Sequence, residues 1–271
     1  MKQGSKWIIG LALVFLPLLF CSGKFSVQKD YGVFLGVSAE KSHKIRDYAL
    51  VVIDAAYYEK SDLQQLRKQC NRQIYSYLNV GSIENFREGQ EKFNDLMLGA
   101  YEHWPGEAWV DVSQPSWQSY VLRQAKVLKK KGVDGLFLDN VDVYSLYPDQ
   151  TIYQGLLTIV TELDGLGLKL MVNGGKDFVL KGLKQGVLQG KLDAVNQEEV
   201  FTRIRFDTRM MVLRPEAERK DNQDYLDTIA AHGLSAYLLE YGETSEITPL
   251  VKPYASRHQF HYYISETIEL E

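Results

Sequence analysis

Short apolar runs alternate with longer amphipathic segments along most of the chain. The runs are typical of buried strands, and the segments between them carry apolar residues at helical spacing. Strands repeated with intervening helices predict a parallel sheet, and eight of them predict a single (β/α)8 TIM-type barrel. The expected strands are residues 49–54, 74–79, 108–111, 135–138, 168–173, 192–198, 236–240 and 260–264, with a spare strand at 31–36.

The intervening segments predict the helices that would cover such a barrel. Pro115 stands where a helix begins and Gly132 where it ends. A doubly wound open sheet is the alternative fold, but no glycine-rich phosphate loop follows any expected strand. Residues 201–220 show no clear period. Helices are expected at residues 61–70, 115–131, 151–166, 176–190 and 222–232.

The N-terminus has the pattern of a targeting segment. Lys2 and Lys6 precede an apolar run over residues 7–20 that is short for a membrane span. The run ends at Cys21 in a sequence that resembles a bacterial lipoprotein box, although Phe20 is larger than the small residue such a box has. We expect a signal peptide, a lipoprotein signal or a membrane anchor.

This expectation divides the chain into three parts. Residues 1–22 are the targeting segment, residues 23–47 a linker with a first edge segment, and residues 48–271 the barrel domain. The protein is then secreted or attached to the outer face of the bacterial cell membrane. Membrane contact would occur only through the N-terminal segment.

Composition adds one hint about the ligand. The chain has 271 residues, of which 45% are hydrophobic and 24% charged, as in an ordinary globular protein. Its net charge of −4 gives no reason to expect nucleic-acid binding. The 17 Tyr and 4 Trp residues offer aromatic faces that suit sugar rings. We expect a monomer with a polysaccharide substrate.

An acid or an amide stands at the end of nearly every expected strand. In a barrel these carboxyl ends meet in one bowl, where such enzymes bind their ligands. Each polar group could instead cap the helix that follows it. The tip residues are Asp54, Asn79, Asp111, Asp139, Asn173, Glu198 and Glu240.

Two of these strands carry the same spacing of acids. One runs from Asp134 to Asp139 and the other from Asp193 to Glu198. Equal spacing suggests equal depth in the barrel, and alternation then gives both acids the same facing. Two acids on nearby tips are what glycoside hydrolysis needs. Glu199 should point elsewhere, but Glu198 and Glu199 both remain candidates for the second acid.

Other chemistries fit the sequence less well. His258 and His261 lack an acidic partner at metal-ligand spacing, and no Gly-x-Ser-x-Gly elbow occurs. The segment from Asp139 to Asp142 could hold a divalent cation, but it lacks the Gly and distal Glu of a calcium loop. We expect no metal and no cofactor. The alternatives are a non-catalytic polysaccharide-binding barrel and a metal-dependent sugar transferase.

Several ordered blocks give the chain a family resemblance. It resembles glycoside hydrolase family 114, the endo-α-1,4-polygalactosaminidase-like barrel proteins, over roughly residues 48–265. The blocks are residues 77–82 with Arg87, residues 104–112, residues 132–142 with Tyr144, Asn173-Gly174, the block around Glu198, and Glu240-Tyr241.

The resemblance implies cleavage within an α-1,4-linked galactosamine-containing exopolysaccharide of the kind found in biofilms. It implies Asp139 and Glu198 as the catalytic pair, and analogy with retaining barrel glycosidases makes Asp139 the nucleophile and Glu198 the acid/base. An acid-rich bowl would attract a polycationic amino sugar. The basic start of the 201–220 segment would instead suit an acidic or N-acetylated polymer. The implied substrate-binding residues are Asp54, Tyr77, Asn79, Asp111, Asn140, Asp142, Asn173 and Glu240.

Overall fold

The computed structural model describes residues 29–102 and 104–271. The expected targeting segment, residues 1–22, lies outside the described residues. Within the described residues, no helix has the length and apolar character needed to cross a membrane.

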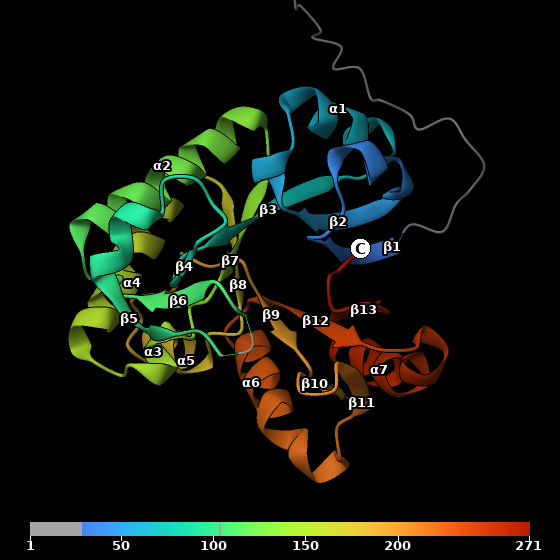
Figure 1. Cartoon of the computed structure of the whole chain (residues 1–271). Helices are drawn as coiled ribbons and strands as arrows, with labels where there is room; N and C mark the ends of the chain where they lie inside the picture. The colour runs from blue at the N-terminus through green and yellow to red at the C-terminus, as the bar shows by residue number, and fades with distance from the viewer. Residues whose placement is uncertain (1–28, 103) are drawn as a thin grey trace, which may run out of the picture.

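Eight parallel strands form the centre of the molecule. Every ladder between neighbours in this sheet is parallel, and its two outermost strands, β1 and β13, lie beside each other, so the sheet nearly closes on itself (Figure 1). The predicted (β/α)8 barrel is therefore confirmed. In sheet order the strands are β1 (Lys29–Phe34), β2 (Tyr48–Ile53), β3 (Gln73–Asn79), β7 (Gly135–Asp139), β8 (Lys169–Asn173), β9 (Ala194–Glu198), β12 (Ser235–Tyr241) and β13 (His261–Ser265).

One strand was assigned to the wrong place by the sequence pattern. The run expected as the third barrel strand is β6 (Glu107–Val110), which pairs antiparallel with β4 (Ser82–Glu84) and β5 (Met97–Ala100) in a separate sheet. The connection from β5 to β6 is too short for a parallel crossover. The spare strand, β1, supplies the eighth barrel strand instead.

Helices surround the barrel on its outside (Figure 1). Pro115 begins α2, and Gly132 ends it in the left-handed conformation, as the sequence predicts. Helix α7 contains two prolines, which is why the pattern did not reveal it. The helices are α1 (Lys60–Lys68), α2 (Pro115–Lys131), α3 (Val143–Leu146), α4 (Gln150–Asp164), α5 (Lys176–Lys184), α6 (Lys220–Ala231) and α7 (Thr244–His258), with short 3-10 helices at Ala39–Lys44, Ala55–Tyr57, Glu91–Leu96 and Glu216–Glu218.

The segment without a clear period, residues 201–220, contains a hairpin. Its strands are β10 (Thr202–Arg205) and β11 (Met210–Leu213), which pair antiparallel. The hairpin follows the carboxyl end of β9, as the small β4–β6–β5 sheet follows β3. Both therefore stand at the carboxyl-end face of the barrel.

Alternation along the barrel strands divides their side chains into two buried layers. Alternate residues fill the barrel interior, among them Tyr75, Phe137 and Met171. The residues between them, such as Leu138 and Leu238, pack beneath the helices. This two-residue period decides which strand-tip side chains enter the bowl.

Helix α4 approaches the chain after β6 closely at Gly155. A Cβ atom there would lie 2.5 Å from the Val112 carbonyl oxygen and 2.7 Å from the Ser113 nitrogen. We expect Gly155→Ala to lower the free energy of unfolding by about 1–3 kcal/mol, because backbone atoms must shift to admit the methyl group. Urea denaturation measures this. Gln154→Ala, one residue away and exposed, should change stability by less than about 0.5 kcal/mol; equal stability of the two variants would contradict the close contact.

Candidate active site

The predicted acids Asp139 and Glu198 end two strands that flank β8. Asp139 is the last residue of β7 and Glu198 the last of β9, and the tip of β8 between them is Asn173. All three face the barrel interior, because they lie in phase with the inward-facing Phe137, Met171 and Ala194. Both carboxylates are partly exposed, whereas Asn173 is buried.

The side-chain amide of Asn173 joins the two acids. Its Nδ2 donates to Asp139 Oδ1 at 2.9 Å and to Glu198 Oε1 at 2.7 Å. Because both bonds share one nitrogen, these two oxygens lie no farther apart than about 5.6 Å, the sum of the two distances. This upper limit admits the ~5–5.5 Å typical of retaining glycosidases and lies below the ~6.5–9.5 Å typical of inverting ones.

The two acids do not lie at the equal depth that their spacing suggested. The ladder pairs Leu138 with Val172 and Asn173 with Asn196. Asp139 is thus level with Asn196, and Glu198 stands two residues farther along its strand. The shared facing was predicted correctly. The extra reach of the Glu side chain and the position of Asn173 between the acids bring the carboxylates together despite the offset.

The surroundings of Glu198 allow it to hold a proton near neutral pH. Burial raises the pKa of Glu198 to about 7, and the negative charge of Asp139 adds to the rise. Hydrogen bonds from Tyr241 Oη, at 2.5 Å from Glu198 Oε2, and from Asn173 oppose it. Burial also raises the pKa of Asp139, against hydrogen bonds from Asn173, the Asn140 backbone and Tyr77.

Neither neighbouring glutamate joins the pair. Glu199 has a left-handed backbone, φ 58°, and its carboxylate accepts a hydrogen bond from the Ile204 backbone in the hairpin. Glu240 faces away from the interior and is fully buried, where it accepts bonds from the backbone nitrogens of Val200, Phe201 and Thr202. Glu240 therefore fastens the chain after β9, outside the bowl.

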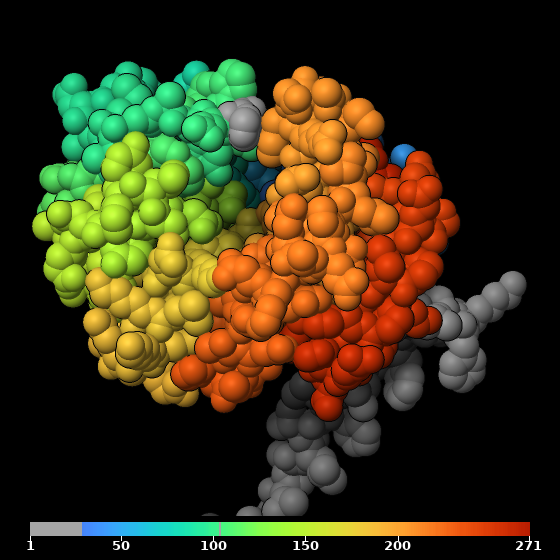
Figure 2. Space-filling view, turned by 90° about the horizontal axis from the view of Figure 1, so that it is seen from below, coloured from blue at the N-terminus to red at the C-terminus, as the bar shows by residue number. Residues whose placement is uncertain are grey.

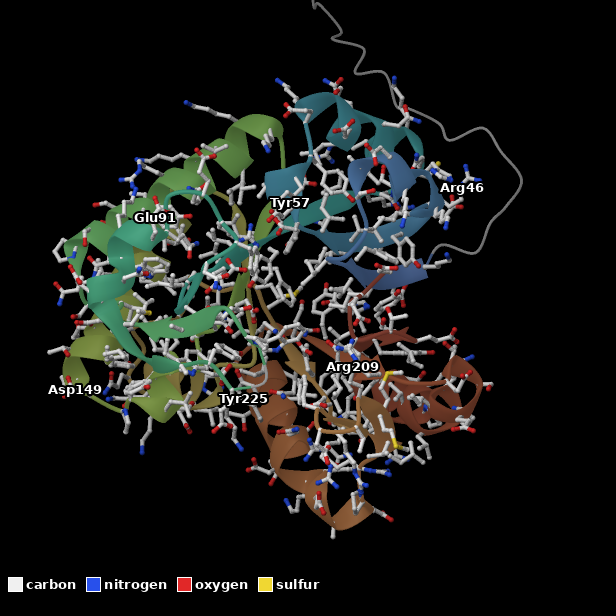
Figure 3. The ribbon with its side chains drawn as sticks, in the orientation of Figure 1. Arg46, Tyr57, Glu91, Asp149, Arg209 and Tyr225 are labelled. Carbon is white, nitrogen blue, oxygen red and sulfur yellow. The ribbon has the colours of Figure 1, made fainter. Side chains whose placement is uncertain are left out.

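Asp54 and Tyr77 belong to a second charged group beside the pair. Arg87 Nη2 donates to Asp54 Oδ2 at 2.8 Å, and Arg87 also pairs with Glu84. The Tyr77 hydroxyl, which has one hydrogen to donate, lies 3.4 Å from Glu84 Oε1 and also within hydrogen-bonding distance of Asp139. The guanidinium lies over the ring of Tyr57, an exposed side chain labelled in Figure 3.

Asn79 and Asn140 are buried and hold the loops around the bowl. Asn79 Nδ2 and Asn140 Nδ2 both donate to the Ser82 hydroxyl, at 2.7 and 3.0 Å. Ser82 donates to Glu107 at 2.9 Å, and Tyr101 donates to Asn140 Oδ1 at 3.0 Å. Burial raises the pKa of Glu107 to about 7. This network ties the β4–β6–β5 sheet to the tips of β3 and β7.

The last two predicted residues have local partners. Asp111 follows β6, outside the barrel sheet, and accepts bonds from Ser113 and Gln114 at the start of α2. Both oxygens of Asp142 lie 3.1 Å from the backbone nitrogen of Gly175, the residue before α5. Within residues 29–102 and 104–271, no three His, Cys, Asp or Glu side chains group as metal ligands would.

The sequence matches the model of a known family. The model of glycoside-hydrolase family GH114 matches residues 22–186, more than half of the chain. The chain belongs to family GH114. It is therefore a glycosidase, as the strand-tip acids and the sequence blocks predicted.

Two solved structures share this fold over nearly the whole of the chain. The glycoside hydrolase domain of PelA from Pseudomonas aeruginosa has a TM-score of 0.73 at 21% identity, with 90% of this chain and 96% of that one covered. Ega3 from Aspergillus fumigatus, in complex with galactosamine, has a TM-score of 0.69 at 17% identity, with 92% and 95% covered. At such identities the likeness shows the fold alone.

Two further matches are more remote. An α-galactosidase from Thermus thermophilus has a TM-score of 0.56 at 10% identity, with 87% of this chain and 57% of that one covered. An uncharacterized protein of Deinococcus radiodurans is 27% identical over 84 residues, which are 29% of this chain and 27% of that protein. The match thus spans about a quarter of that relative's length.

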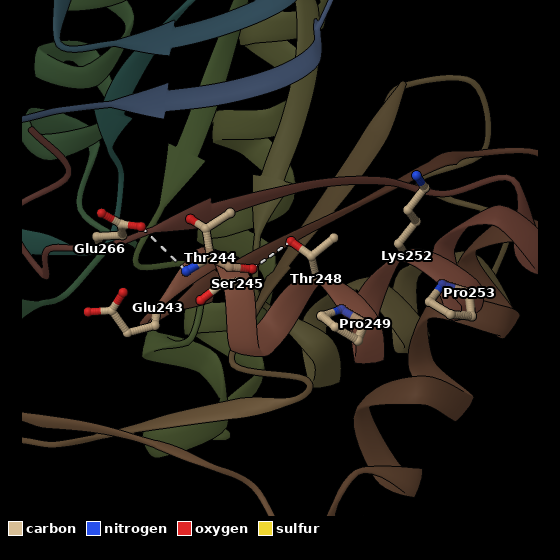
Figure 4. A pocket seen from close by; sticks show the side chains of 8 residues that line it. All are labelled: Glu243, Thr244, Ser245, Thr248, Pro249, Lys252, Pro253 and Glu266. Carbon is tan, nitrogen blue, oxygen red and sulfur yellow. Dashed lines mark hydrogen bonds between the residues drawn. The ribbon is translucent and has the colours of Figure 1, made fainter.

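The carboxyl-end face of this GH114 barrel is hollowed. Figure 2 shows the hollow between the green β4–β6 region and the orange hairpin, with blue atoms at its floor. Trp104 and Phe206, from the two sides, lie with ring centroids 6.2 Å apart. A separate, open surface pocket of about 640 Å³ lies along the start of α7, between Glu243 and Glu266 (Figure 4), and none of the predicted site residues lines it.

Several residues at the site were not among the predicted ones. Tyr241 lies in the Glu240-Tyr241 block and is not a predicted site residue, yet its hydroxyl donates to Glu198. Alternation from Tyr237 and Leu239 would have placed Tyr241, not Glu240, in the interior. Asn196 has the same phase as Glu198. Glu84 and Glu107 lie opposite each other in the small antiparallel sheet, whose pairing no local pattern revealed.

The Tyr241 hydroxyl should hold the pKa of Glu198 down. We expect Tyr241→Phe to raise that pKa above its value of about 7, by about one pH unit, because the carboxylate loses a donor. Carbon-13 NMR titration of the labelled glutamate carboxyls measures it. Tyr237→Phe, on the same strand and the same face, should leave the titration unchanged. A Glu198 titration that is the same with and without the Tyr241 hydroxyl would contradict this account.

Proposed function

We propose that this GH114 protein is a retaining glycosidase that cleaves within an amino-sugar exopolysaccharide, with Asp139 as nucleophile and Glu198 as acid/base. One observation carries the proposal: a single amide nitrogen, Asn173 Nδ2, bonds both carboxylates. An inverting mechanism needs a water molecule between one carboxylate and the sugar. The short separation of the two carboxylates leaves no room for that water.

The division of roles rests on the partners of each acid. Asp139 accepts from Asn173, the Asn140 backbone and Tyr77, donors that stabilise its ionised form against the burial that raises its pKa. Glu198, with a pKa of about 7, can carry a proton at neutral pH. In the first step an Asp139 oxygen attacks the anomeric carbon, the glycosidic bond breaks, and the Glu198 proton passes to the leaving oxygen. Water then attacks that carbon, gives its proton to Glu198 and releases Asp139.

The acidic surroundings support an amino sugar as substrate. Asp54, Glu84 and Glu107 stand beside the pair, and Arg87 is the cation that contacts the first two. The remaining negative charge suits a polymer of protonated amines. The Ega3 structure holds galactosamine, which agrees with this choice. We therefore propose an α-1,4-linked galactosamine-containing polymer, as the family resemblance implies.

The proposed substrate fits the proposed location. An exopolysaccharide lies outside the cell, and residues 1–22 have the pattern of a signal that leads there. We propose that the protein is a monomer, secreted or attached to the outer face of the membrane. Fractionation of expressing cells, with the protein recovered in the cytoplasm, would contradict the location.

Loss of either acid should abolish cleavage while the fold persists. We expect Glu198→Gln to lower kcat/KM by roughly 10²–10⁴-fold, because the proton donor is lost, and Asp139→Asn to lower it at least as much. The assay is the mass of oligosaccharides released from de-N-acetylated and N-acetylated α-1,4-galactosamine polymers. Glu199→Gln, the adjacent acid tied to Ile204, is the matched control and should keep its activity. Full activity of both pair variants would exclude the assignment.

The separation of the acids also predicts the stereochemical outcome. The first product formed should carry the α configuration of the bond that was cut, because two successive displacements restore it. Proton NMR of the anomeric signals in the first minutes of the reaction, before mutarotation, decides this. A β product would overturn the retaining mechanism and Asp139 as nucleophile.

A further inference from the structure

A line of hydrogen bonds runs beneath the two carboxylates through the barrel interior. Tyr31 Oη donates to Asn196 Oδ1 at 3.0 Å, and Asn196 Nδ2 donates to Asn173 Oδ1 at 2.7 Å. Asn173 Nδ2 then donates to Asp139 and Glu198. Every member donates toward the acids, so the line has one direction from β1 through β9 and β8 to the pair.

The direction of these hydrogen bonds determines which way the Asn173 side-chain amide is turned. The oxygen and nitrogen of an Asn side chain are nearly equal in shape, so packing alone does not select one orientation. Asn173 must present its nitrogen, with two hydrogens, to two acids. In the reverse orientation its oxygen would face both carboxylates, and two acceptors would lose their donor. The Asn196 amide, which donates to Asn173 Oδ1, makes the productive orientation the favoured one.

The lower end of the line fixes Asn196 in turn. The Tyr31 hydroxyl is a donor to Asn196 Oδ1 and also lies 4.0 Å from the sulfur of Met171. The Tyr31 ring packs on Tyr237, with centroids 4.7 Å apart. Asn196 is 0% exposed and Tyr31 2% exposed. Solvent has no access to replace either donor, so each link of the line depends on its neighbour.

We propose that Asn196 and Tyr31 are positioning residues, which hold the Asn173 amide nitrogen toward the carboxylates of Asp139 and Glu198. They touch no substrate and act only through Asn173. The proposal rests on the proposed function, because it assigns a task to residues beneath that pair. It also gives β1 a part in the chemistry, since the strand that closes the barrel supplies the first donor.

Several titratable groups face Glu198, and each of them contributes to its pKa. Asp139 comes from β7, Tyr241 from β12, Tyr31 from β1 and Tyr101 from the chain before β6, while Glu199 is adjacent in sequence. Among these groups, only Tyr31 is connected to the pair through the hydrogen bonds of Asn196 and Asn173. A variant of Tyr31 or Asn196 therefore changes the orientation of Asn173 without removing a direct partner of Glu198.

Two variants test the line from its two ends. Tyr31→Phe removes only the hydroxyl, and we expect kcat to fall about threefold to tenfold with KM nearly unchanged. Asn196→Asp places an acceptor opposite Asn173 Oδ1, which should turn the amide over and lower kcat roughly 10²-fold. In Tyr31→Phe both limbs of the pH–rate profile should move to higher pH, because a carboxylate that loses a donor binds its proton more tightly; the limbs are read on this variant, since the carboxylate added in Asn196→Asp raises them by its own charge. Loss of packing alone would not move them.

Tyr75→Phe is the matched control. Tyr75 also fills the barrel interior, but its neighbours include Asp134 and Asp193 at the opposite end of the strands. It should keep the wild-type kcat and pH profile. If Asn196→Asp does not fold, as judged by circular dichroism, Tyr31→Phe decides alone. A folded Tyr31→Phe with wild-type kcat and pH limbs overturns the positioning role.

Failure of the proposed function gives a different result. Undiminished cleavage by Asp139→Asn and Glu198→Gln would overturn the catalytic pair, and with it the positioning role. If those two variants are inactive while Tyr31→Phe matches Tyr75→Phe in rate and profile, the pair stands and only the positioning role falls.

Discussion

The barrel strands are buried on both faces, and their two-residue period decides which side chains form the site. In a barrel of parallel strands, each successive side chain enters either the interior or the layer beneath the helices. Asp139, Asn173 and Glu198 enter the interior, whereas Glu240 does not. A shift of one residue in any of these strands would exchange a bowl residue for a packing residue. The site therefore depends on the register of these strands.

Much of the fold could be predicted because the barrel strands are local apolar runs with clear ends. The pairing of β6 could not, because a short strand after a Trp-Pro-Gly turn looks the same whether it joins a barrel or a hairpin. The acids at Asp134 and Asp193, whose spacing suggested equal depth, instead accept backbone bonds from Ile74 and Leu170 at the amino ends of the strands. Equal spacing from those anchors does not give equal depth, since neighbouring strands are staggered around a barrel.

The candidate pair could be predicted because each acid stands at the end of a local apolar run, whereas the residues that support the pair are brought together only by the fold. An acid at a strand tip can be recognised from the sequence alone. The amide that joins two acids is recognised only when three strands are placed side by side. Tyr241 and Asn196 are in phase with known interior residues, and the phase rule alone would have added them. Glu84 and Glu107 depend on antiparallel pairing within a small sheet, which is a long-range contact that no local pattern encodes.

The charges of the bowl explain why its support is neutral. In the part of the chain that the structure describes, the side chains that hydrogen-bond the pair are amides and tyrosine hydroxyls, and Arg87 is directed to Asp54 and Glu84 instead. A lysine or arginine against Glu198 would lower its pKa and remove the proton it needs to donate. A cationic substrate would also meet repulsion there. Neutral donors keep the two acids together while leaving their charge to interact with the sugar.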